Sequence, residues 1–315
     1  MNFYGLVDGC DASLRGFLGS LSGVDQIGAQ SRAAMLATRS IKTTAKKWAI
    51  DLAISMVDLT TLEGADTAGK IRALCSKAVR PEPSDSSVPS VGAVCVYNDR
   101  VSIARKHLDL IGGAHVPVAA VTTAFPSGRA SKAVKMQDTQ DAIDAGAAEI
   151  DMVIDRGAFL SGHYLEVFDQ ILQIRRLCGD RAHLKVILET GELVTYDNVR
   201  KASFLAMLAG ADFIKTSTGK ISPAATPPVV LVMLEAVRDF YEMTGRRIGV
   251  KPAGGIRNTK DAIRQLVLVN ETAGPEWLTP TLFRIGASAL LNDLLMQRMK
   301  MRDGYYPNPS YVTID

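Results

Sequence analysis

The sequence has few of the features that mark extracellular or metal-binding proteins. Its four cysteines, Cys10, Cys75, Cys95 and Cys178, lie far apart and form no C-x-x-C pair. Cys75 and Cys95 stand in apolar surroundings, which is typical of small buried side chains. The four histidines are scattered as well, so no His/Cys cluster indicates a metal site. We therefore expect a reduced, cytoplasmic protein with no disulfide framework, no metal and no other cofactor.

Long apolar runs and strong charge are also missing. No stretch approaches the ~20 apolar residues needed to cross a bilayer, and no basic segment followed by an apolar one opens the chain. The net charge is only +3 in 315 residues, and the Lys and Arg residues are scattered. This pattern argues against a nucleic-acid or membrane partner. A small anionic substrate remains compatible, because it needs only a local positive site.

What the sequence does contain is a regular alternation of strand-like and helix-like segments. Eight short apolar runs are separated by segments with helical periodicity, which indicates βαβ units and a parallel sheet. We predict a TIM (β/α)8 barrel rather than a doubly wound sheet, because eight units close a barrel and no G-x-G-x-x-G opens a helix. The predicted strands are Ile54–Leu59, Val91–Tyr97, Val116–Thr122, Ala148–Ile154, His183–Glu189, Asp212–Thr216, Ile248–Pro252 and Leu282–Gly286. The predicted helices are Thr67–Val79, Val101–Ile111, Ser131–Ala145, Tyr164–Cys178, Tyr196–Ala209, Pro227–Thr244, Thr259–Asn270 and Ala287–Met301.

The ends of the chain lie outside this alternation. Residues 1–50 are rich in Gly, Ser and Ala and become helix-like from about Ser31 to Ala53, which predicts an N-terminal helical extension. Residues 51–302 form the predicted barrel domain. Residues 303–315 contain Pro307 and Pro309 and are expected to be a flexible tail.

Two of the predicted strands end in a lysine, Lys215 and Lys251, each followed by a Gly-containing loop. Strand alternation places both on an inner face, together with Asp58, Asp151 and Lys185. Two neighbouring ammonium groups repel, so one lowers the pKa of the other, and a partly neutral amine is what Schiff-base chemistry requires. The alternative is that each lysine extends its ammonium to solvent at a strand end.

The two aspartates have structural readings as well. Asp151 is suited to neutralise Lys185 or Lys251, and a carboxylate held beside a cation can also pass protons through a bound water. Asp58 ends the first predicted strand, where it serves either as a loop hydrogen-bonder or as a contact for a substrate hydroxyl.

Three loops after the last three predicted strands are suited to phosphate. They are Thr218-Gly219-Lys220, Gly254-Gly255 and Gly286-Ala287-Ser288. Loops at this place in a barrel commonly offer backbone N–H groups and a helix N-terminus to phosphate. Each loop alone is a weak signal, since Gly-Gly is most often only a turn, and the shared position is the stronger one.

The motifs together resemble those of the deoxyribose-phosphate aldolase family. The string Phe-Ile-Lys-Thr-Ser-Thr-Gly-Lys at 213–220 is highly specific, and the other matching stretches run in family order from about residue 54 to 290. They are 56–62 (MVDLTTL), 93–97 (AVCVY), 149–154 (EIDMVI), 184–193 (LKVILETGEL), 251–257 (KPAGGIR) and 284–288 (RIGAS).

The resemblance implies a metal-free class I aldolase that reversibly cleaves 2-deoxy-D-ribose 5-phosphate, in deoxyribose phosphate catabolism. By position, Lys215 would form the Schiff base, Lys251 would favour its neutral form and assist proton transfer, and Asp151 would move protons through water. Phosphate would be held by Lys220, Gly254, Gly255 and Ser288, and further substrate contacts would come from Asp58, Thr60, Lys185, Thr218, Gly219 and Gly286. The partner is thus a small sugar phosphate, and a homodimer is one assembly that fits.

The chain departs from the family pattern in two places. Many members have a second hydroxyl residue where this chain has Ala289, and some end in a tyrosine where this chain ends in Asp315. Tyr305, Tyr306 or Tyr311 would have to substitute for that tyrosine. Two alternatives stay open: a Schiff-base aldolase for a different sugar phosphate, and a catalytically inactive barrel that binds a sugar phosphate or a protein.

Overall fold

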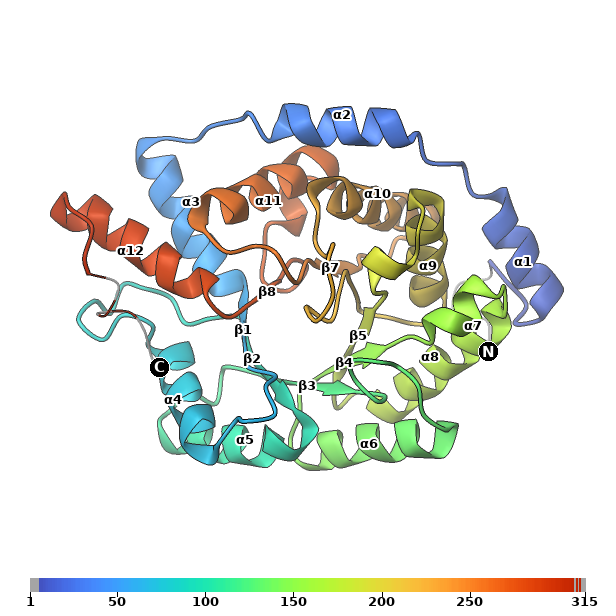
Figure 1. The fold of residues 1–315 in the computed structure, drawn as a ribbon, viewed down its shortest axis with the longest axis horizontal. Coiled ribbons are helices and arrows are strands. Elements are labelled where there is room, and N and C mark those ends of the chain that lie inside the picture. The colour runs from blue at the N-terminus through green and yellow to red at the C-terminus, as the bar shows by residue number, and fades with distance from the viewer. Residues whose placement is uncertain (1–5, 309, 311, 313–315) are drawn as a thin grey trace.

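Eight parallel strands form a barrel at the centre of the computed structural model, which describes residues 6–308, 310 and 312 (Figure 1). The strands are β1 (Val57–Thr60), β2 (Ala93–Tyr97), β3 (Val118–Thr122), β4 (Glu149–Val153), β5 (His183–Ile187), β6 (Phe213–Lys215), β7 (Gly249–Lys251) and β8 (Ile285–Ala287). They are hydrogen-bonded in the order β7-β6-β5-β4-β3-β2-β1-β8. The two end strands also meet, because Val250 pairs with Phe283 and accepts the N–H of Arg284. The predicted (β/α)8 barrel is therefore confirmed, and the open doubly wound sheet is excluded.

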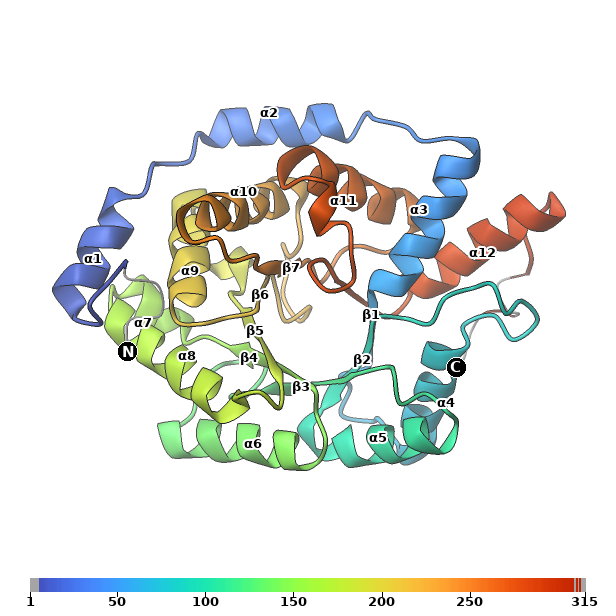
Figure 2. The ribbon, with the colours of Figure 1, turned by 180° about the vertical axis from the view of Figure 1, so that it is seen from behind.

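Helices surround the barrel, and most of them follow the predicted bounds (Figures 1 and 2). Thr67, Ser131, Thr195 and Asn258 each cap a helix by accepting a hydrogen bond from the backbone N–H three residues on. The outer helices are α4 (Ala68–Val79), α5 (Val101–Leu110), α6 (Lys132–Asp144), α7 (Arg156–Leu160), α8 (Tyr164–Cys178), α9 (Tyr196–Leu208), α10 (Pro227–Thr244), α11 (Thr259–Thr272) and α12 (Leu290–Asp303). Short 3₁₀ turns in the described part of the chain include η1 (Asn98–Arg100), η2 (Thr190–Glu192) and η3 (Pro275–Trp277).

Two strand predictions were displaced at their ends. Residues 54–56 belong to the last turn of a helix, and β1 begins only at Val57. Ile54 and Met56 are fully buried, and periodicity alone does not separate a buried helix turn from a buried strand. The last strand starts at Ile285, three residues after the predicted Leu282, and the following helix starts at Leu290 rather than at residue 287.

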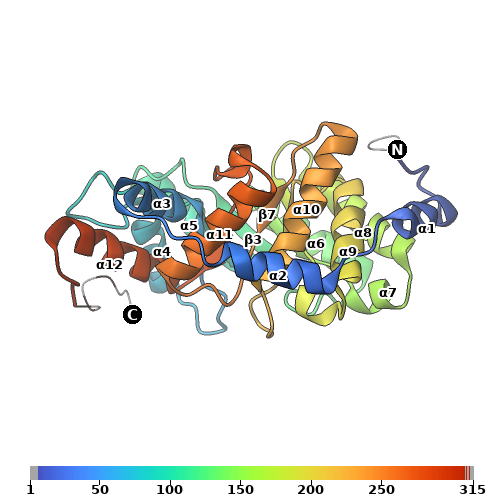
Figure 3. The same cartoon turned by 90° about the horizontal axis from the view of Figure 1, so that it is seen from above.

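From residue 6 onward, the N-terminal extension contains three helices, where the sequence predicted one from about residue 31 to 53. They are α1 (Asp11–Ser20), α2 (Gln26–Leu36) and α3 (Thr43–Met56). The predicted helix is interrupted by residues 37–42, and Thr43, the first residue of α3, has a left-handed φ of 53°. In Figure 3, α2 lies along the outside of α10 and α11, and its buried residues Ala29, Ala33 and Leu36 lie on one helical face. The extension thus forms a second layer over part of the barrel.

The predicted C-terminal tail is only partly visible. Helix α12 ends at Asp303, and residues 309, 311 and 313–315, including Tyr311, lie outside the described residues. The carbonyl of Val312 accepts a hydrogen bond from Nζ of Lys77, at 2.5 Å. Within the described part of the chain, no helix is long and apolar enough to cross a membrane.

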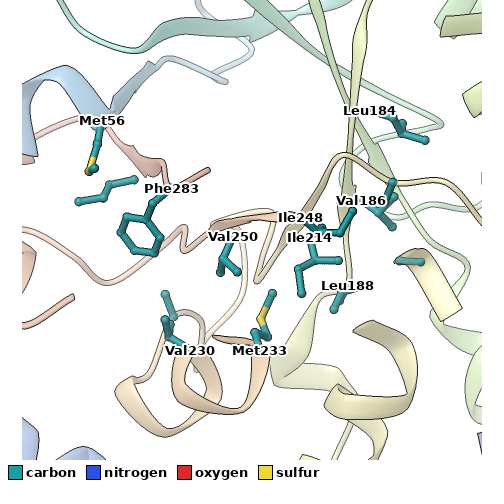
Figure 4. Packing of buried hydrophobic residues seen from close by; sticks show 14 of the residues in the cluster. Met56, Leu184, Val186, Leu188, Ile214, Val230, Met233, Ile248, Val250 and Phe283 are labelled. Atoms are coloured by element: carbon teal, nitrogen blue, oxygen red, sulfur yellow. The ribbon is translucent and has the colours of Figure 1, made fainter. Parts of the chain in front are cut away.

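The apolar core lies between the barrel and its helices. Figure 4 shows Ile214 of β6 and Val250 of β7 beside Val230 and Met233 of α10. These four side chains are fully buried. Because strand residues alternate in direction, their neighbours Phe213, Lys215, Gly249 and Lys251 point the other way, into the barrel. The outward face therefore holds the fold together, while the inward face is free to carry polar groups.

Candidate active site

Six charged side chains form a closed ring inside the barrel. Lys251 Nζ lies 2.7 Å from Oδ2 of Asp151 and 2.5 Å from Oδ2 of Asp58. The guanidinium of Arg284 joins Asp58 to Glu149, at 2.7 Å and 3.0 Å. Lys185 completes the circle, because its Nζ contacts Glu149 and lies 3.4 Å from Oδ1 of Asp151. We call Asp58, Glu149, Asp151, Lys185, Lys251 and Arg284 the charge ring.

Lys215 is a seventh group attached to this ring. Its Nζ donates to Oδ2 of Asp151 at 2.7 Å, so it shares that oxygen with Lys251. The ring itself contains three cations and three carboxylates among the described residues, and Lys215 adds one surplus positive charge when protonated. An uncompensated buried charge is costly, so loss of one proton from this set is favoured.

The central carboxylate and its lysine partner keep their charges. Burial alone would raise the pKa of Asp151, but Lys215, Lys251 and Lys185 outweigh burial and hold that pKa well below its usual range. Burial would lower the pKa of Lys251, but Asp151 and Asp58 outweigh it and raise that pKa well above its ordinary value. Asp151 therefore stays ionised and Lys251 stays protonated at neutral pH.

Asp58 and Arg284, on the other side of the ring, also keep their charges. Burial would raise the pKa of Asp58, yet Lys251 and Arg284 hold it below its ordinary value. Burial would lower the pKa of Arg284, yet Asp58 and Glu149 raise it. Cys95 of β2 lies among these groups, and burial raises the pKa of its thiol, so it adds no charge. None of these groups is suited to lose or gain a proton first.

A cavity of about 800 Å³ opens at the carboxyl ends of β1, β6, β7 and β8. Nine of the residues predicted to serve the site lie on its described wall, which also includes Arg257 of the loop after β7. The nine are Thr60, Lys215, Thr218, Gly219, Lys220, Gly254, Gly255, Gly286 and Ser288. Asp151 is not part of the wall but contacts Lys215, and Lys251 contacts the same oxygen of Asp151. Asp58 and Lys185, predicted to touch substrate, are fully buried members of the ring and do not line this cavity.

The loop after β7 offers unused donors to the cavity. Gly254 and Gly255 both have left-handed backbones, with φ of 83° and 88°, which other residues rarely adopt. A Cβ on Gly254 would lie 2.7 Å from the Cβ of Ala224. Within the described residues, the two glycine N–H groups make no hydrogen bond. Successive free N–H groups of this kind form a concave anion site.

The loop after β6 is held in a different way. Glu189 follows β5 with a left-handed φ of 54° and is almost fully buried. Its carboxylate accepts the hydroxyl of Thr218 at 2.5 Å and the N–H of the same residue at 3.2 Å. Both donors of Thr218 are therefore used by Glu189. Lys220 forms an ion pair with Glu63, another residue of the cavity wall, with 2.9 Å between Nζ and Oε1. Lys220 is the cation of this loop that reaches the cavity mouth.

Sequence reasoning did not assign a role to Glu149, Arg284, Arg257 or Glu189. The signal for Glu149 was present, because it shares the inward face of its strand with Asp151. The signal for Arg284 was present too, because it lies within the predicted strand 282–286 and alternates with the apolar Phe283 and Ile285. Glu189 was placed at the end of a regular strand, and nothing local indicated a left-handed residue there.

Comparisons with known proteins agree with this geometry. The family model described as DeoC/LacD family aldolase matches residues 52–295. Deoxyribose-phosphate aldolase of Homo sapiens is 48% identical over 267 residues, covering 81% of this chain and 83% of the relative. The Mus musculus enzyme of the same name is 47% identical over 272 residues, covering 83% and 84%.

A solved structure shows the same fold. The deoxyribose phosphate aldolase from Aeropyrum pernix superposes with a TM-score of 0.61 at 24% identity, covering 84% of this chain and 100% of that one. At this identity the likeness concerns the fold alone. The family model spans most of the chain, including all eight strands and the whole charge ring, and the chain therefore belongs to the DeoC/LacD family of aldolases.

Proposed function

We propose that the chain reversibly cleaves 2-deoxy-D-ribose 5-phosphate to D-glyceraldehyde 3-phosphate and acetaldehyde through a Schiff base on Lys215. The proposal rests on which buried cation of the site can be reached from the cavity. Of the four buried cations among the described residues of the site, Lys215 alone lines the cavity. Lys185, Lys251 and Arg284 are each held between two carboxylates. Of these four cations, Lys215 is therefore the one that a substrate aldehyde can reach.

The first step forms the covalent bond. The free amine of Lys215 adds to the C1 aldehyde, and the resulting carbinolamine loses its oxygen as water to leave an iminium. Asp151 contacts Lys215 and Lys251 through one oxygen, so protons can move between the two lysines over two contacts of 2.7 Å each. This arrangement supplies the proton that the leaving hydroxyl needs without drawing it from bulk water.

The second step breaks the carbon–carbon bond. The iminium accepts the electron pair of the C2–C3 bond and becomes an enamine, while the C3 hydroxyl loses its proton and C3 becomes the aldehyde of glyceraldehyde 3-phosphate. C2 of the enamine then takes a proton, and water hydrolyses the new iminium to release acetaldehyde and the free amine. Asp151 moves these protons through a water molecule.

The loops at the cavity mouth fit the phosphate of this substrate. The free N–H groups of Gly254 and Gly255 and the ammonium of Lys220 face the same cavity, together with Gly286 and Ser288 before α12. Helix N-termini and backbone N–H groups of this kind bind phosphate. We further propose that the enzyme serves deoxyribose phosphate catabolism and acts without a metal, so that EDTA leaves its activity unchanged.

Borohydride reduction in the presence of acetaldehyde tests the mechanism. We expect a mass increase of one reduced acetaldehyde unit, mapped by peptide sequencing to Lys215 and absent from Lys215→Ala. Lys260→Ala is the matched control, because Lys260 is an exposed lysine of α11 and its loss leaves trapping unchanged. An adduct on another lysine, or no adduct, would overturn the assignment.

A different sugar phosphate is the second candidate, favoured by the size of the cavity. Its volume of about 800 Å³ leaves room around a five-carbon sugar phosphate. A panel of sugar phosphates, with the product aldehydes identified, separates the two. If deoxyribose 5-phosphate is not the best substrate while Lys215 is still trapped, the chemistry stands and the substrate changes.

A further inference from the structure

The half of the charge ring farthest from Lys215 is not part of the cavity wall. Glu149 and Arg284 do not line the cavity, and neither contacts Lys215. Their contact joins positions 135 residues apart in the sequence, between β4 and the residue before β8. Burying a charged pair costs desolvation free energy, and a protein with an apolar pair of similar size in its place is often equally stable. A role beyond stability would therefore explain their presence.

The chain makes room for this arginine. A Cβ on Gly92, just before β2, would lie 3.1 Å from Nη1 and 3.2 Å from Cδ of Arg284, and 2.8 Å from the carbonyl of Ser55. Because Gly92 has no side chain, the guanidinium of Arg284 has room beside it. Its Nη1 donates to Asp58 and its Nη2 donates to Glu149. A lysine has a single nitrogen and lacks this planar fork.

Charge counting shows what these residues contribute. In the intact ring three cations balance three carboxylates, so the ring is neutral. Protonated Lys215 is then the surplus charge. Removing Arg284 or Lys185 would leave the ring negative, and it would retain the ammonium of Lys215. Removing the charge of Glu149 would leave it positive and would favour the free amine.

Resting on the proposed function, we propose that Glu149, Lys185 and Arg284 are positioning residues of the aldolase reaction. Together with Asp58 they keep the ring around Asp151 and Lys251 neutral, and this neutrality makes Lys215 the group that gives up its proton. The charged and titratable groups of the barrel interior act on Lys215 by direct contact, as Asp151 does, or from a greater distance through the ring. They are Asp58 of β1, Cys95 of β2, Glu149 and Asp151 of β4, Lys185 of β5, Lys251 of β7 and Arg284 beside β8.

The pH dependence of borohydride trapping tests the proposal directly. Acetaldehyde carries no phosphate, so the yield of adduct reports the free amine of Lys215 without involving the phosphate loops. We expect Arg284→Gln and Lys185→Gln to move the midpoint of trapping to higher pH by about one unit or more, which is a tenfold loss below the midpoint. Glu149→Gln should move it to lower pH. Arg284→Lys, which keeps the charge, should remain close to the wild type.

The double variant Glu149→Gln/Arg284→Gln provides the sharpest comparison, because it removes one charge of each sign. We expect its trapping midpoint to return to within about half a unit of the wild type, although both side chains have changed. Circular dichroism shows which variants are folded. If Arg284→Gln does not fold, Lys185→Gln takes its place, because it also removes one positive charge from the ring.

Two outcomes would overturn the proposal. The midpoints of the single variants could remain unchanged while only the amplitude falls, or Glu149→Gln and Arg284→Gln could shift in the same direction. Either result would leave the far half of the ring with a purely structural role. If the wild type itself shows no adduct on Lys215, the proposed function fails instead, so the two failures are distinguishable.

Discussion

Lys215 and Lys251 lie directly opposite each other in the pairing of β6 with β7, and both donate to the same oxygen, Oδ2 of Asp151, from 2.7 Å. Two ammonium groups on one carboxylate oxygen leave one positive charge unbalanced at this point. The raised pKa of Lys251, for which Asp151 and Asp58 outweigh burial, assigns the permanent charge to that lysine. Lys215, which reaches the cavity, is left as the amine that can act as a nucleophile.

Asp151→Asn tests this shared contact. An amide is neutral and cannot hold two ammonium groups, so we expect kcat to fall by ~10²–10⁴, the usual contribution of a proton-transfer group. The remaining buried cations would also be undercompensated, and breaking a buried pair costs about 3–5 kcal/mol of unfolding free energy. Steady-state cleavage rates and urea unfolding measure the two effects. Asp155→Asn, at the N-cap of α7 after β4, is the control for a nearby aspartate outside the ring, because asparagine also serves as an N-cap. A variant with wild-type kcat would contradict the proton relay.

Glu189→Gln tests how the phosphate loop is held. The carboxylate of Glu189 accepts both the hydroxyl and the N–H of Thr218, and hydrogen bonds to a charged group contribute about 1.5–3 kcal/mol. We expect a looser loop and a KM for deoxyribose 5-phosphate that rises by about tenfold, with kcat changed much less. Glu192→Gln is the matched control, because Glu192 lies three residues away and pairs with Arg156. Equal effects of the two variants would show that the contact with Thr218 does not matter.

The inward face of the barrel could be predicted from the sequence because strand alternation is a local property. Asp58, Asp151, Lys185, Lys215 and Lys251 were all placed inside the barrel on that basis, and the structure brings all five together. What alternation could not give was depth along the strand. Asp58 and Lys185, predicted as substrate contacts, are fully buried members of the ring and are not part of the cavity wall, and their contact with substrate stays a prediction.

The closure of the ring could not be predicted, because it depends on contacts between distant segments. The contact of Arg284 with Asp58 joins residues 226 positions apart, and the barrel must close before the two meet. The N-terminal helices were misjudged for another reason. A helical pattern from residue 31 to 53 does not reveal that residues 37–42 leave the helix or that Thr43, where α3 begins, adopts a left-handed backbone.

Glu63→Gln tests the ion pair that spans the cavity mouth. Glu63 holds Nζ of Lys220 at 2.9 Å, and a substrate phosphate would have to compete with this carboxylate. An exposed pair is worth about 0.2–1 kcal/mol, so we expect the KM for deoxyribose 5-phosphate to fall by up to about fivefold. The difference should shrink at high salt, and unphosphorylated deoxyribose is the internal control with an unchanged KM. A raised KM for the phosphorylated substrate would instead show that Glu63 helps to orient Lys220.

The stability of the fold should depend on pH through the same buried charges. The pKa values of Asp58 and Asp151 are lowered in the folded state, because their cationic neighbours outweigh burial. Their contribution is therefore complete above the unfolded value of about 4 and is lost as pH falls below it. The pKa of Lys251 is raised, because its carboxylate neighbours outweigh burial, so its contribution is complete below about pH 10.4 and is lost as pH rises beyond that value.

Urea unfolding between pH 2 and 11 should therefore show a plateau that falls away at both ends, and the acidic decline has a limiting slope of ~1.4 kcal/mol per pH unit for each such carboxylate. The double variant Asp58→Asn/Arg284→Gln removes one carboxylate together with its guanidinium partner, which are joined at 2.7 Å. Its acidic decline should be shallower, because one carboxylate fewer takes up a proton. Its alkaline decline should begin at the same pH but be smaller, because Lys251 has lost one of its two anionic neighbours and its folded-state pKa is raised less. An unchanged acidic slope in this variant would mean that Asp58 is not held ionised by the ring.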